Sequence, residues 1–408
     1  MIQRILILLL SIVLSGSVFS QDFNFFIVGR NGDTLNDTVF IIEGMTLNLS
    51  TNFEQLGIEY VSFKDNESYG NDGVGFPVGF NFKYYGENKD IFNISPTGFI
   101  TFNEPLGFPI RYPNKEIPFR DAERFQNSIH GCFMVWEPVS DKSVSVYRTV
   151  EDTVSILCVT WCDSPINRPA DPANPTGTFQ IVLNNKDEIS IHLVNIPKSE
   201  DHGGNATMGI VSDWIQFTAV IGMNNEPWTP IQEQSFIFTP EEDDVNYDYE
   251  MIEFAPHPVP EYIVWYEVDE SGNETEIGSN YNISVKPKQT TKYRAELYSC
   301  WGDTIASAEI TVDITGAFPN AFRPASTIEE NKTFKIMLKE TPVDVVGYLL
   351  QVYNRWGQLV FETDDYKEGW DGTFKGSACS AGVYNWTLMF EESGKSKIAT
   401  SGSVMLLR

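Results

Sequence analysis

Short stretches in which apolar and polar residues alternate follow one another along almost the whole chain. Examples are residues 38–50 (TVFIIEGMTLNLS), 144–150 (VSVYRTV) and 178–185 (TFQIVLNN). A period of two predicts half-buried β-strands, and strands that recur roughly every 8 to 12 residues with turns between them are typical of β-sandwiches. Because helical periodicity is almost absent, the sequence predicts an all-β protein made of tandem β-sandwich domains.

Changes in composition mark the expected domain boundaries. Residues 241–250 (EEDDVNYDYE) carry six acidic side chains, and residues 255–262 (APHPVPEY) hold three prolines. Runs of this kind are typical of linkers. The expected order is a signal peptide at 1–20, an N-terminal β region at 21–62, a large sandwich at 63–240, an acidic linker at 241–254, a small immunoglobulin-like module at 255–315 and a C-terminal domain at 316–408.

The first twenty residues predict export. Arg4 precedes an apolar run, and Val18-Phe19-Ser20 provides a plausible cleavage site before Gln21. This is the layout of a secretory signal peptide, and the run is shorter than the about 20 apolar residues of a membrane span. We therefore expect an exported protein without a membrane-spanning segment.

The charge balance excludes one class of partner. The chain has 56 Asp and Glu against 28 Lys and Arg, a formal net charge of −28. Such a chain repels nucleic acid and anionic lipid surfaces. Since the acidic residues are scattered, a solubilising surface is the simplest interpretation.

Five cysteines are an odd number for an exported chain. Cys158 and Cys162 stand too far apart on one extended strand to bond to each other. Either could pair with Cys132 across neighbouring strands, while Cys300 and Cys379 are isolated in the sequence. At least one thiol is expected to stay free within the chain, and no CxxC motif indicates zinc or redox chemistry.

Two tryptophans near the C-terminus lie in glycine-bearing turns. Trp356 is in the turn Asn354-Arg355-Trp356-Gly357, between two strand patterns, and Trp370 is in Gly369-Trp370-Asp371-Gly372. Gly357 can adopt the positive φ that a short hairpin needs. An indole at a turn can fold over the open end of a sandwich and donate its N–H to a carbonyl. We expect both rings to be structural caps of a small terminal domain.

The order of motifs in residues 317–408 resembles the gliding motility-associated C-terminal domain, the type B sorting domain of type IX secretion. The resemblance implies transport across the outer membrane by the type IX secretion machinery, to the extracellular face of that membrane or into the medium. Residues 323–334 (RPASTIEENKTF) depart from the loop usual in that family. The positions that carry the resemblance are Asn320, Phe322, Asn354, Arg355, Trp356, Gly357, Gly369, Trp370, Asp371, Gly372, Gly382, Tyr384 and Arg408.

Two further resemblances concern the preceding domains. Residues 63–240, with Phe80-Asn81-Phe82, Thr97-Gly98-Phe99 and Phe179-Gln180-Ile181, resemble a nidogen-like extracellular β-sandwich. Residues 255–315, with Trp265 on an early strand, resemble an immunoglobulin-like or polycystic-kidney-disease-type module. These resemblances imply adhesion or matrix contact by the sandwich and a stiff spacer behind it.

Catalytic chemistry is not indicated. The chain has four histidines, and no nucleophile elbow, HExxH helix or glycine-rich phosphate loop is present. His130 precedes Gly131-Cys132 in a pattern that predicts a buried strand, and His192 is expected on the outer face of a strand. The sequence therefore predicts no enzyme and no catalytic residue.

The acidic segment offers the one candidate metal site. Its alternating oxygen-bearing residues would face one side of an extended chain, and calcium prefers such ligands. The segment lacks the glycine and the distal glutamate of an EF-hand loop, so a solvated linker without a cofactor is the default. The calcium candidates are Asp244, Asn246, Asp248 and Glu250.

The preferred function is an adhesion or binding module for an unknown surface glycan or protein ligand. The alternative is a structural component of a surface or motility-linked assembly, and a secreted hydrolase is a less favoured third. Trp136, Trp214 and Trp228 are candidates for glycan contact, although such residues more often belong to the core.

Overall fold

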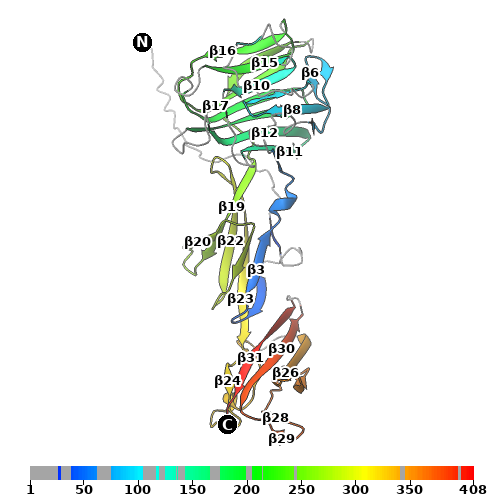
Figure 1. Cartoon of the computed structure of the whole chain (residues 1–408), viewed down its shortest axis with the longest axis vertical. Coiled ribbons are helices and arrows are strands. Elements are labelled where there is room, and N and C mark those ends of the chain that lie inside the picture. Colours follow the sequence, from blue (N-terminus) through cyan, green and yellow to red (C-terminus); the bar gives the residue numbers. More distant parts are fainter. Residues whose placement is uncertain are drawn as a thin grey trace, which may run out of the picture.

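The computed structural model describes residues 26–28, 38–61, 75–103, 116–118, 125–134, 136, 143–165, 175–198, 205–213, 215–242, 246–340, 345–393 and 397–408. Within these residues the chain is almost entirely β-structure, which confirms the predicted fold class; its helical turns are short 3-10 segments, η1 (Phe53–Gln55) and η4 (Glu329–Asn331). Figure 1 shows an elongated arrangement with a large sandwich at one end, an immunoglobulin-like module in the middle and the C-terminal domain at the other end. The predicted signal peptide lies outside the described residues.

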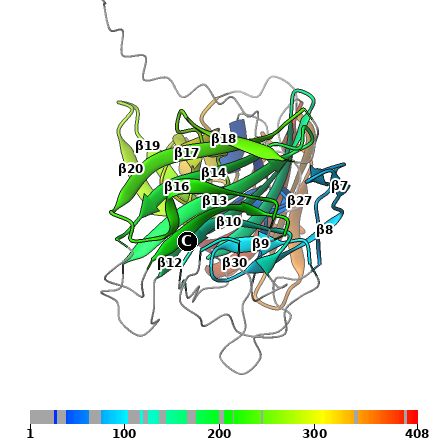
Figure 2. The ribbon, with the colours of Figure 1, turned by 90° about the horizontal axis from the view of Figure 1, so that it is seen from above.

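Two antiparallel sheets form the large sandwich, seen from above in Figure 2. The six-stranded sheet has the order β16 (Phe217–Glu226), β15 (Ala206–Val211), β10 (Ser128–Phe133), β9 (Phe99–Thr101), β8 (Ile91–Ser95), β5 (Phe76–Pro77). The seven-stranded sheet has the order β18 (Tyr247–Ile252), β17 (Ile231–Pro240), β14 (Ile189–Ile196), β13 (Thr176–Asn184), β12 (Val154–Pro165), β11 (Val144–Glu151), β4 (Glu59–Tyr60), and a small hairpin joins β6 (Lys83–Tyr84) to β7 (Glu87–Asn88).

Aromatic side chains fill the space between the two sheets. The Trp161 ring stacks on Phe179 with centroids 4.7 Å apart, and Trp136 approaches the same phenyl ring at 5.5 Å. The Trp136 indole N–H donates to the Cys132 carbonyl at 2.7 Å, so its polar atom is satisfied inside the core. Gly98 lies against this group with a φ of +93°, and a Cβ there would stand 2.2 Å from the Cys132 oxygen. Glycine is therefore required at position 98 of the Thr97-Gly98 turn, because a side chain there would clash with the Cys132 carbonyl.

The immunoglobulin-like module is made from two distant parts of the chain. Its main sheet has the order β2 (Thr38–Ile42), β23 (Thr304–Ala317), β22 (Thr291–Ser299), β19 (Pro260–Val268), β20 (Glu274–Gly278), with β25 (Met337–Leu338) added on β23. The facing sheet contains β1 (Ile27–Val28), β3 (Leu47–Thr51) and β21 (Asn282–Val285). The described part of the expected N-terminal β region therefore belongs largely to this module, and the large sandwich is inserted between β3 and β19.

The same N-terminal strand links the module to the C-terminal domain. β2 pairs in parallel with the end of β23, from Thr38 opposite Thr311 to Ile42 opposite Gly316. Val39 and Ile41 are buried in the core of the module, whereas Ile42 is buried in the core of the C-terminal domain. One short strand thus contributes side chains to two cores.

The C-terminal domain has a five-stranded sheet in which alternation is nearly perfect. Its order is β24 (Ala321–Phe322), β31 (Ile398–Leu406), β30 (Gly382–Glu392), β26 (Val345–Tyr353), β27 (Leu359–Thr363), and a separate hairpin joins β28 (Thr373–Phe374) to β29 (Ser377–Ala378). In β30 the inward side chains are Tyr384, Trp386, Leu388 and Phe390.

A connecting segment, residues 253–259, crosses the outer face of the seven-stranded sheet and is called the strap below. The Ala255 N–H donates to Ser235 Oγ at 3.4 Å, and Val259 is buried against the sheet beside Ile156. Gln180 is fully buried and clamps the strap, because its Oε1 accepts the His257 N–H at 2.9 Å and its Nε2 donates to the His257 carbonyl at 3.0 Å. The joint between sandwich and module is therefore packed and hydrogen-bonded.

The strap and β18 correct the expected acidic linker at 241–254. Residues 247–252 pair with β17 over six consecutive positions, from Pro240 opposite Tyr247 to Ser235 opposite Ile252. Acidic side chains alternate with the buried or half-buried Tyr247 and Tyr249, so the segment is an edge strand with a solvated outer face. A high content of acidic residues is compatible with both a linker and an exposed edge strand, so composition alone could not distinguish them.

The structure does not form the pairing of Cys132 with Cys158 or Cys162 that the sequence left open, and all five cysteines are present as free thiols. Cys132 points into the core between the sheets, where its thiol contacts the Met134 sulfur at 3.5 Å, while Cys158 points to the opposite, outer face of the seven-stranded sheet.

Replacing Gln180 by Ala tests the strap. The substitution leaves a half-buried N–H and a half-buried carbonyl of His257 without their side-chain partner, so we expect the free energy of unfolding to fall by about 1–3 kcal/mol. Urea unfolding measures the loss, and hydrogen exchange at the His257 amide should accelerate. Gln232→Ala, at an exposed position of β17, is the matched control; equal stability of Q180A and Q232A would contradict the clamp.

Candidate functional site

Trp370 is the centre of the C-terminal core. Its ring is fully buried, lies 4.7 Å from Tyr384 and 5.3 Å from Phe322, and its indole N–H donates to the Thr373 carbonyl at 2.8 Å. The Trp370 backbone also exchanges two hydrogen bonds with Phe334. This is the structural role expected from the sequence.

Trp356 differs, and the expectation that it caps the domain is wrong. It lies at the tip of the β26–β27 hairpin with 76% of its surface exposed. Asn354 Oδ1 accepts the N–H groups of Trp356 and Gln358, both at 3.0 Å, and Gly357 has the expected positive φ of +77°. The Arg355 guanidinium lies 4.2 Å from the indole centre. The turn therefore presents a cation and an aromatic ring to solvent from a rigid base.

Arg408 ties the last strand to the turn after Trp370. Its guanidinium donates to the Gly372 carbonyl at 2.7 Å and to the Cys379 carbonyl at 2.7 and 3.1 Å. The Cys379 N–H also donates to the Gly372 carbonyl at 2.9 Å. These contacts bring the signature positions 369–372 and 408 together, although they are far apart in sequence.

The part of the outer face of β30 and β31 that comprises the odd-numbered residues of 383–389 and 399–407 is uncharged and is called the sorting face below. All these positions bear apolar or neutral polar side chains, and the charged Glu391 lies beyond them at the end of β30. Solvent-exposed apolar side chains stand at both ends of this face, and exposed apolar clusters are typical of interaction sites. They are Val383, Met389, Met405 and Leu407.

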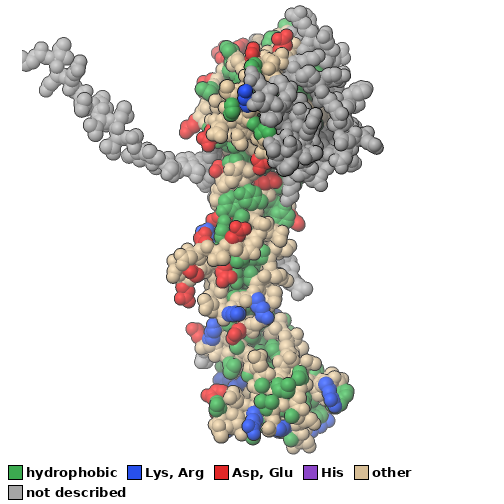
Figure 3. Space-filling model, turned by 60° about the vertical axis from the view of Figure 1, so that its left-hand side comes forward, with side chains coloured by type: hydrophobic (Ala, Val, Ile, Leu, Met, Phe, Trp, Pro, Cys, Tyr) green, Lys and Arg blue, Asp and Glu red, His purple; other side chains and the backbone are tan. Residues whose placement is uncertain are grey.

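Charge is distributed unevenly along the molecule. Residues 316–408 contain 10 Lys and Arg against 11 Asp and Glu, while the preceding residues contain 18 against 45. Figure 3 shows basic side chains on the C-terminal domain and acidic ones over the module and the sandwich. The C-terminal domain is thus electrostatically distinct from the part that it follows.

A second candidate surface lies on the sandwich, at the edge strand β16. Ile221 is 89% exposed, and Phe217 and Ile215 are also exposed; these three residues are called the edge patch below. β16 lies beside β18, where Thr218 Oγ1 donates to the Tyr247 carbonyl at 2.8 Å and the Ile221 N–H donates to Tyr249 Oη at 3.0 Å. Since β18 covers this edge, the patch is a side-chain surface rather than an open strand edge.

The edge patch was missed at the sequence level. Residues 207–222 (TMGIVSDWIQFTAVIG) predict the last strand of the sandwich. Near its end, apolar residues occupy successive positions and do not alternate with polar ones, and this was the signal for apolar side chains on both faces of the strand. The proposed glycan-facing residues Trp136 and Trp228 are buried in the core. Trp214 lies outside the described residues.

The arrangement nearest to catalytic chemistry is a hollow of about 350 Å³ beside the strap. His192 Nδ1 lies 2.7 Å from Ser235 Oγ, and Glu151 Oε1 lies 3.3 Å from His257 Nδ1. Burial, and then the nearby His257 imidazole, lowers the pKa of His192 to about 3. The carboxylate pairs with His257 rather than His192, and Ser235 is buried and holds Ala255, so these groups anchor the strap.

The remaining candidate residues from the sequence are His130 and the four calcium candidates of the acidic segment. His130 is buried and stacks on Phe99, and burial lowers its pKa to about 3, in agreement with a core role. Asp248 and Glu250 lie on the outer side of β18, Asn246 directly precedes that strand, and Asp244 lies outside the described residues. Over the described part of the chain, no group of three or more His, Cys, Asp or Glu is placed to hold a metal ion. In the same residues, no helix is long and apolar enough to cross a membrane.

Two family models match the chain. Residues 316–406 match the CHU_C type IX secretion signal domain, and residues 48–251, half of the chain, match the NIDO-related family. Both are non-catalytic kinds of domain. No curated protein matches the chain.

Similarity to solved structures is low. The FN1–FN3 domains of chicken CNTN1 are 8% identical and cover 65% of this chain and 98% of theirs, with a TM-score of 0.17. Dimeric latent PorU from Porphyromonas gingivalis is 10% identical over 94% of this chain and 34% of its own, with a TM-score of 0.17. A Ca²⁺-stabilised adhesin with which an Antarctic bacterium binds ice is 9% identical over 94% of this chain and 99% of its own, with a TM-score of 0.14. TM-scores at this level carry no information about ligand or activity.

The two turn tryptophans should respond oppositely to truncation. Trp370→Ala removes a fully buried ring and is expected to destabilise the C-terminal domain by about 3–5 kcal/mol. Trp356→Ala removes an exposed ring and should change stability by less than about 0.5 kcal/mol. Urea unfolding of the two variants, followed by intrinsic fluorescence and circular dichroism, checks both values; a large loss in W356A would show that the ring supports the fold after all.

Proposed function

The chain belongs to the NIDO-related family and carries a type IX secretion signal domain, and from this premise we propose that it is an adhesion or binding protein of the cell surface or the medium. The signal domain indicates export. The sandwich would bind a surface glycan or a protein, and the module would act as its spacer. The proposal does not include catalysis, since the two histidines that line the hollow beside the strap, His192 and His257, belong to the contacts that hold the strap.

The edge patch is the observation that carries the binding proposal. In Figure 1, β16 lies at the end of the molecule farthest from the C-terminus. Three apolar side chains exposed at such a distal position favour a contact surface, because burying them would contribute on the order of 1.5–3 kcal/mol each. β18 blocks the β16 edge, which favours side-chain recognition over the alternative of a structural assembly built by strand addition.

Export would depend on exposed features of the signal domain that are dispensable for its fold. We propose that the secretion machinery contacts the Trp356 turn and the sorting face. Both are solvent-accessible, and the charge near the turn comes from Arg355 stacked on the ring. The signature positions would then have two roles. Trp370 and Arg408 stabilise the C-terminal domain, whereas Trp356 contacts the secretion machinery.

Substitutions in the signal domain test the export proposal. Trp356→Ala and Val383→Glu should reduce the amount of protein outside the cell by about tenfold or more, since loss of one buried apolar contact costs on the order of 1.4 kcal/mol. Quantitative immunoblots of the medium, the cell surface and the periplasm provide the measurement. Met337→Glu, an exposed apolar position away from the sorting face, is the control. Normal export of both variants, or of a chain that lacks residues 316–408, would contradict the assignment.

Binding by the sandwich is tested with the full exported chain. Phe217→Glu and Ile221→Glu should lower retention on glycan arrays and on whole-cell surfaces by about tenfold or more. Val150→Glu is the matched control, since Val150 is 65% exposed on β11, away from the edge patch. Retention that is equal for all four proteins would count against the edge patch, and no retention of the unmodified chain on any surface would favour the structural alternative.

A further inference from the structure

Two cysteines from different domains meet at the joint between the sandwich and the module. Cys162 is near the end of β12, at an irregularity where the register with β13 shifts, and its N–H donates to the Ser143 carbonyl at 2.8 Å. Cys300 follows β22 in a tight turn that the Gly302 N–H closes by donating to the Ser299 carbonyl at 3.0 Å. Each is half-buried.

The fold brings these cysteines together through the end of the strap. Val259 is buried against the outer face of β12, in the cluster that contains Cys158, and Cys162 lies four residues farther along this strand. The next residue of the chain, Pro260, begins β19 and pairs with Ser299, which precedes Cys300. The same segment therefore fixes the turn of Cys300 against the end of β12.

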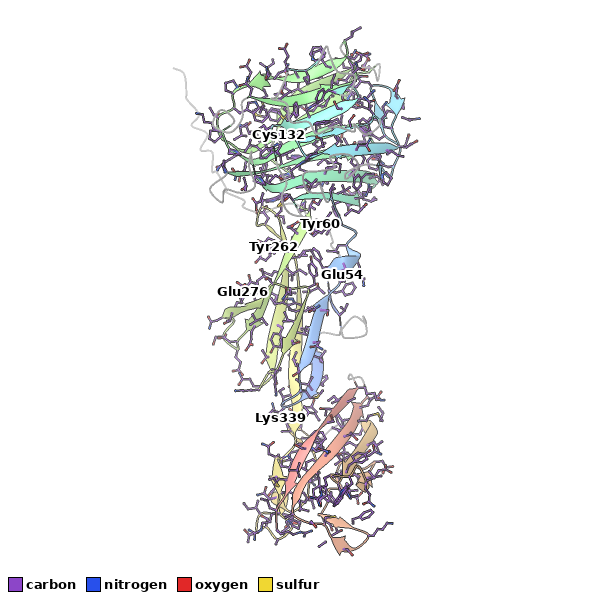
Figure 4. All side chains as sticks on the ribbon, viewed as in Figure 1. Glu54, Tyr60, Cys132, Tyr262, Glu276 and Lys339 are labelled. Atoms are coloured by element: carbon purple, nitrogen blue, oxygen red, sulfur yellow. The ribbon has the colours of Figure 1, made fainter. Side chains whose placement is uncertain are left out.

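The two thiols are neighbours at this joint. Burial raises the pKa of the Cys300 thiol, and the nearby Cys162 thiol raises it further. Tyr60 of the sandwich and Tyr262 of the module are labelled at this joint in Figure 4, and both interact electrostatically with Cys162. Glu261 interacts in the same way with Cys300. Tyr262 also stacks on Tyr298 of β22 with centroids 5.1 Å apart, and Cys300 directly follows this strand.

We propose that Cys162 and Cys300 form a disulfide that covalently locks the sandwich to the module in the exported protein. The other three cysteines have no such partner. Cys132 is in the inner core against Met134, Cys158 is buried in the outer cluster, and Cys379 is in the C-terminal domain. The pairing is thus selected by the fold, and an odd cysteine count leaves three thiols free.

The bond forms by thiol–disulfide exchange with a protein or small-molecule disulfide in the compartment to which the protein is exported. The thiolate of one cysteine attacks a sulfur of that disulfide, and the first reduced thiol leaves. The thiolate of the second cysteine then attacks the mixed disulfide, so that the Cys162–Cys300 bond forms and the second thiol leaves. Two protein thiols are oxidised and one external disulfide is reduced to two thiols. The disulfide would add a third covalent connection between the sandwich and the module, which the chain already joins after β3 and before β19.

Thiol counting on the full chain tests the lock. The purified, reduced protein is incubated with oxidised glutathione, denatured and alkylated without a reductant. Three of the five thiols should be labelled, and mass spectrometry of a non-reduced digest should show one linked pair of peptides that contain Cys162 and Cys300. Labelling of all five thiols in the oxidised chain, or a linkage that involves another cysteine, would overturn the proposal.

Matched variants separate this bond from unspecific oxidation. Cys300→Ser should leave all four remaining thiols open to alkylation, whereas Cys379→Ser should leave two of four. The melting temperature of the unmodified chain and of C379S should fall by about 5 °C or more when a reductant is added, because the bond limits the unfolded chain. The melting temperature of C300S should not respond to the reductant; a response equal to that of the unmodified chain would contradict the assignment.

Discussion

The parallel pairing of β2 with β23 is the constraint on which the rest of this molecule depends. It places the N-terminal strand beside the last strand of the module, from Thr38 opposite Thr311 onward. Everything between β3 and β19 must then leave the module and return to it. The large sandwich is consequently an insertion with two chain connections rather than a bead on a single string. Two connections oppose bending and twisting more strongly than one, so the sandwich is held in a defined direction.

The two joints of the molecule are built by different physics. At the upper joint the chain crosses over a sheet face, and the contacts are the amide clamp of Gln180 and the apolar side chains Ile58 and Val259. At the lower joint β23 continues from the module into the pairing with β25, and the Lys339 N–H donates to the Thr315 carbonyl at 2.9 Å. A buried clamp and a continuous ladder are both alternatives to a flexible linker, and together they hold the edge patch away from the signal domain.

Local patterns predicted much of the fold, because alternation is a property of neighbouring residues. The hairpins of the sandwich follow from such patterns. The partner of β2 could not be predicted, since Thr38 and Thr311 are separated by most of the chain and alternation carries no record of the neighbouring strand. Trp356 and Trp370 show the same limit at a single site. Both lie in glycine-bearing turns, yet one turn folds onto the core and the other projects from a hairpin, and only tertiary packing separates the two cases.

The position of Ile42 connects export with the folding of the whole chain. This side chain comes from the N-terminal strand but is buried in the core of the type IX secretion signal domain, and Phe40 and Met45 pack against the same core. Without β2 the signal domain would expose the apolar surface that these residues cover, and without the signal domain β2 would carry exposed apolar side chains on one face. Because residues of β2 complete the core of the signal domain, this core is fully formed only when β2 has paired with β23. That pairing requires the chain to return from the inserted sandwich to the module. The signal domain is therefore an integral part of the folded protein, and its exposed surfaces reach their final arrangement together with those of the rest of the molecule.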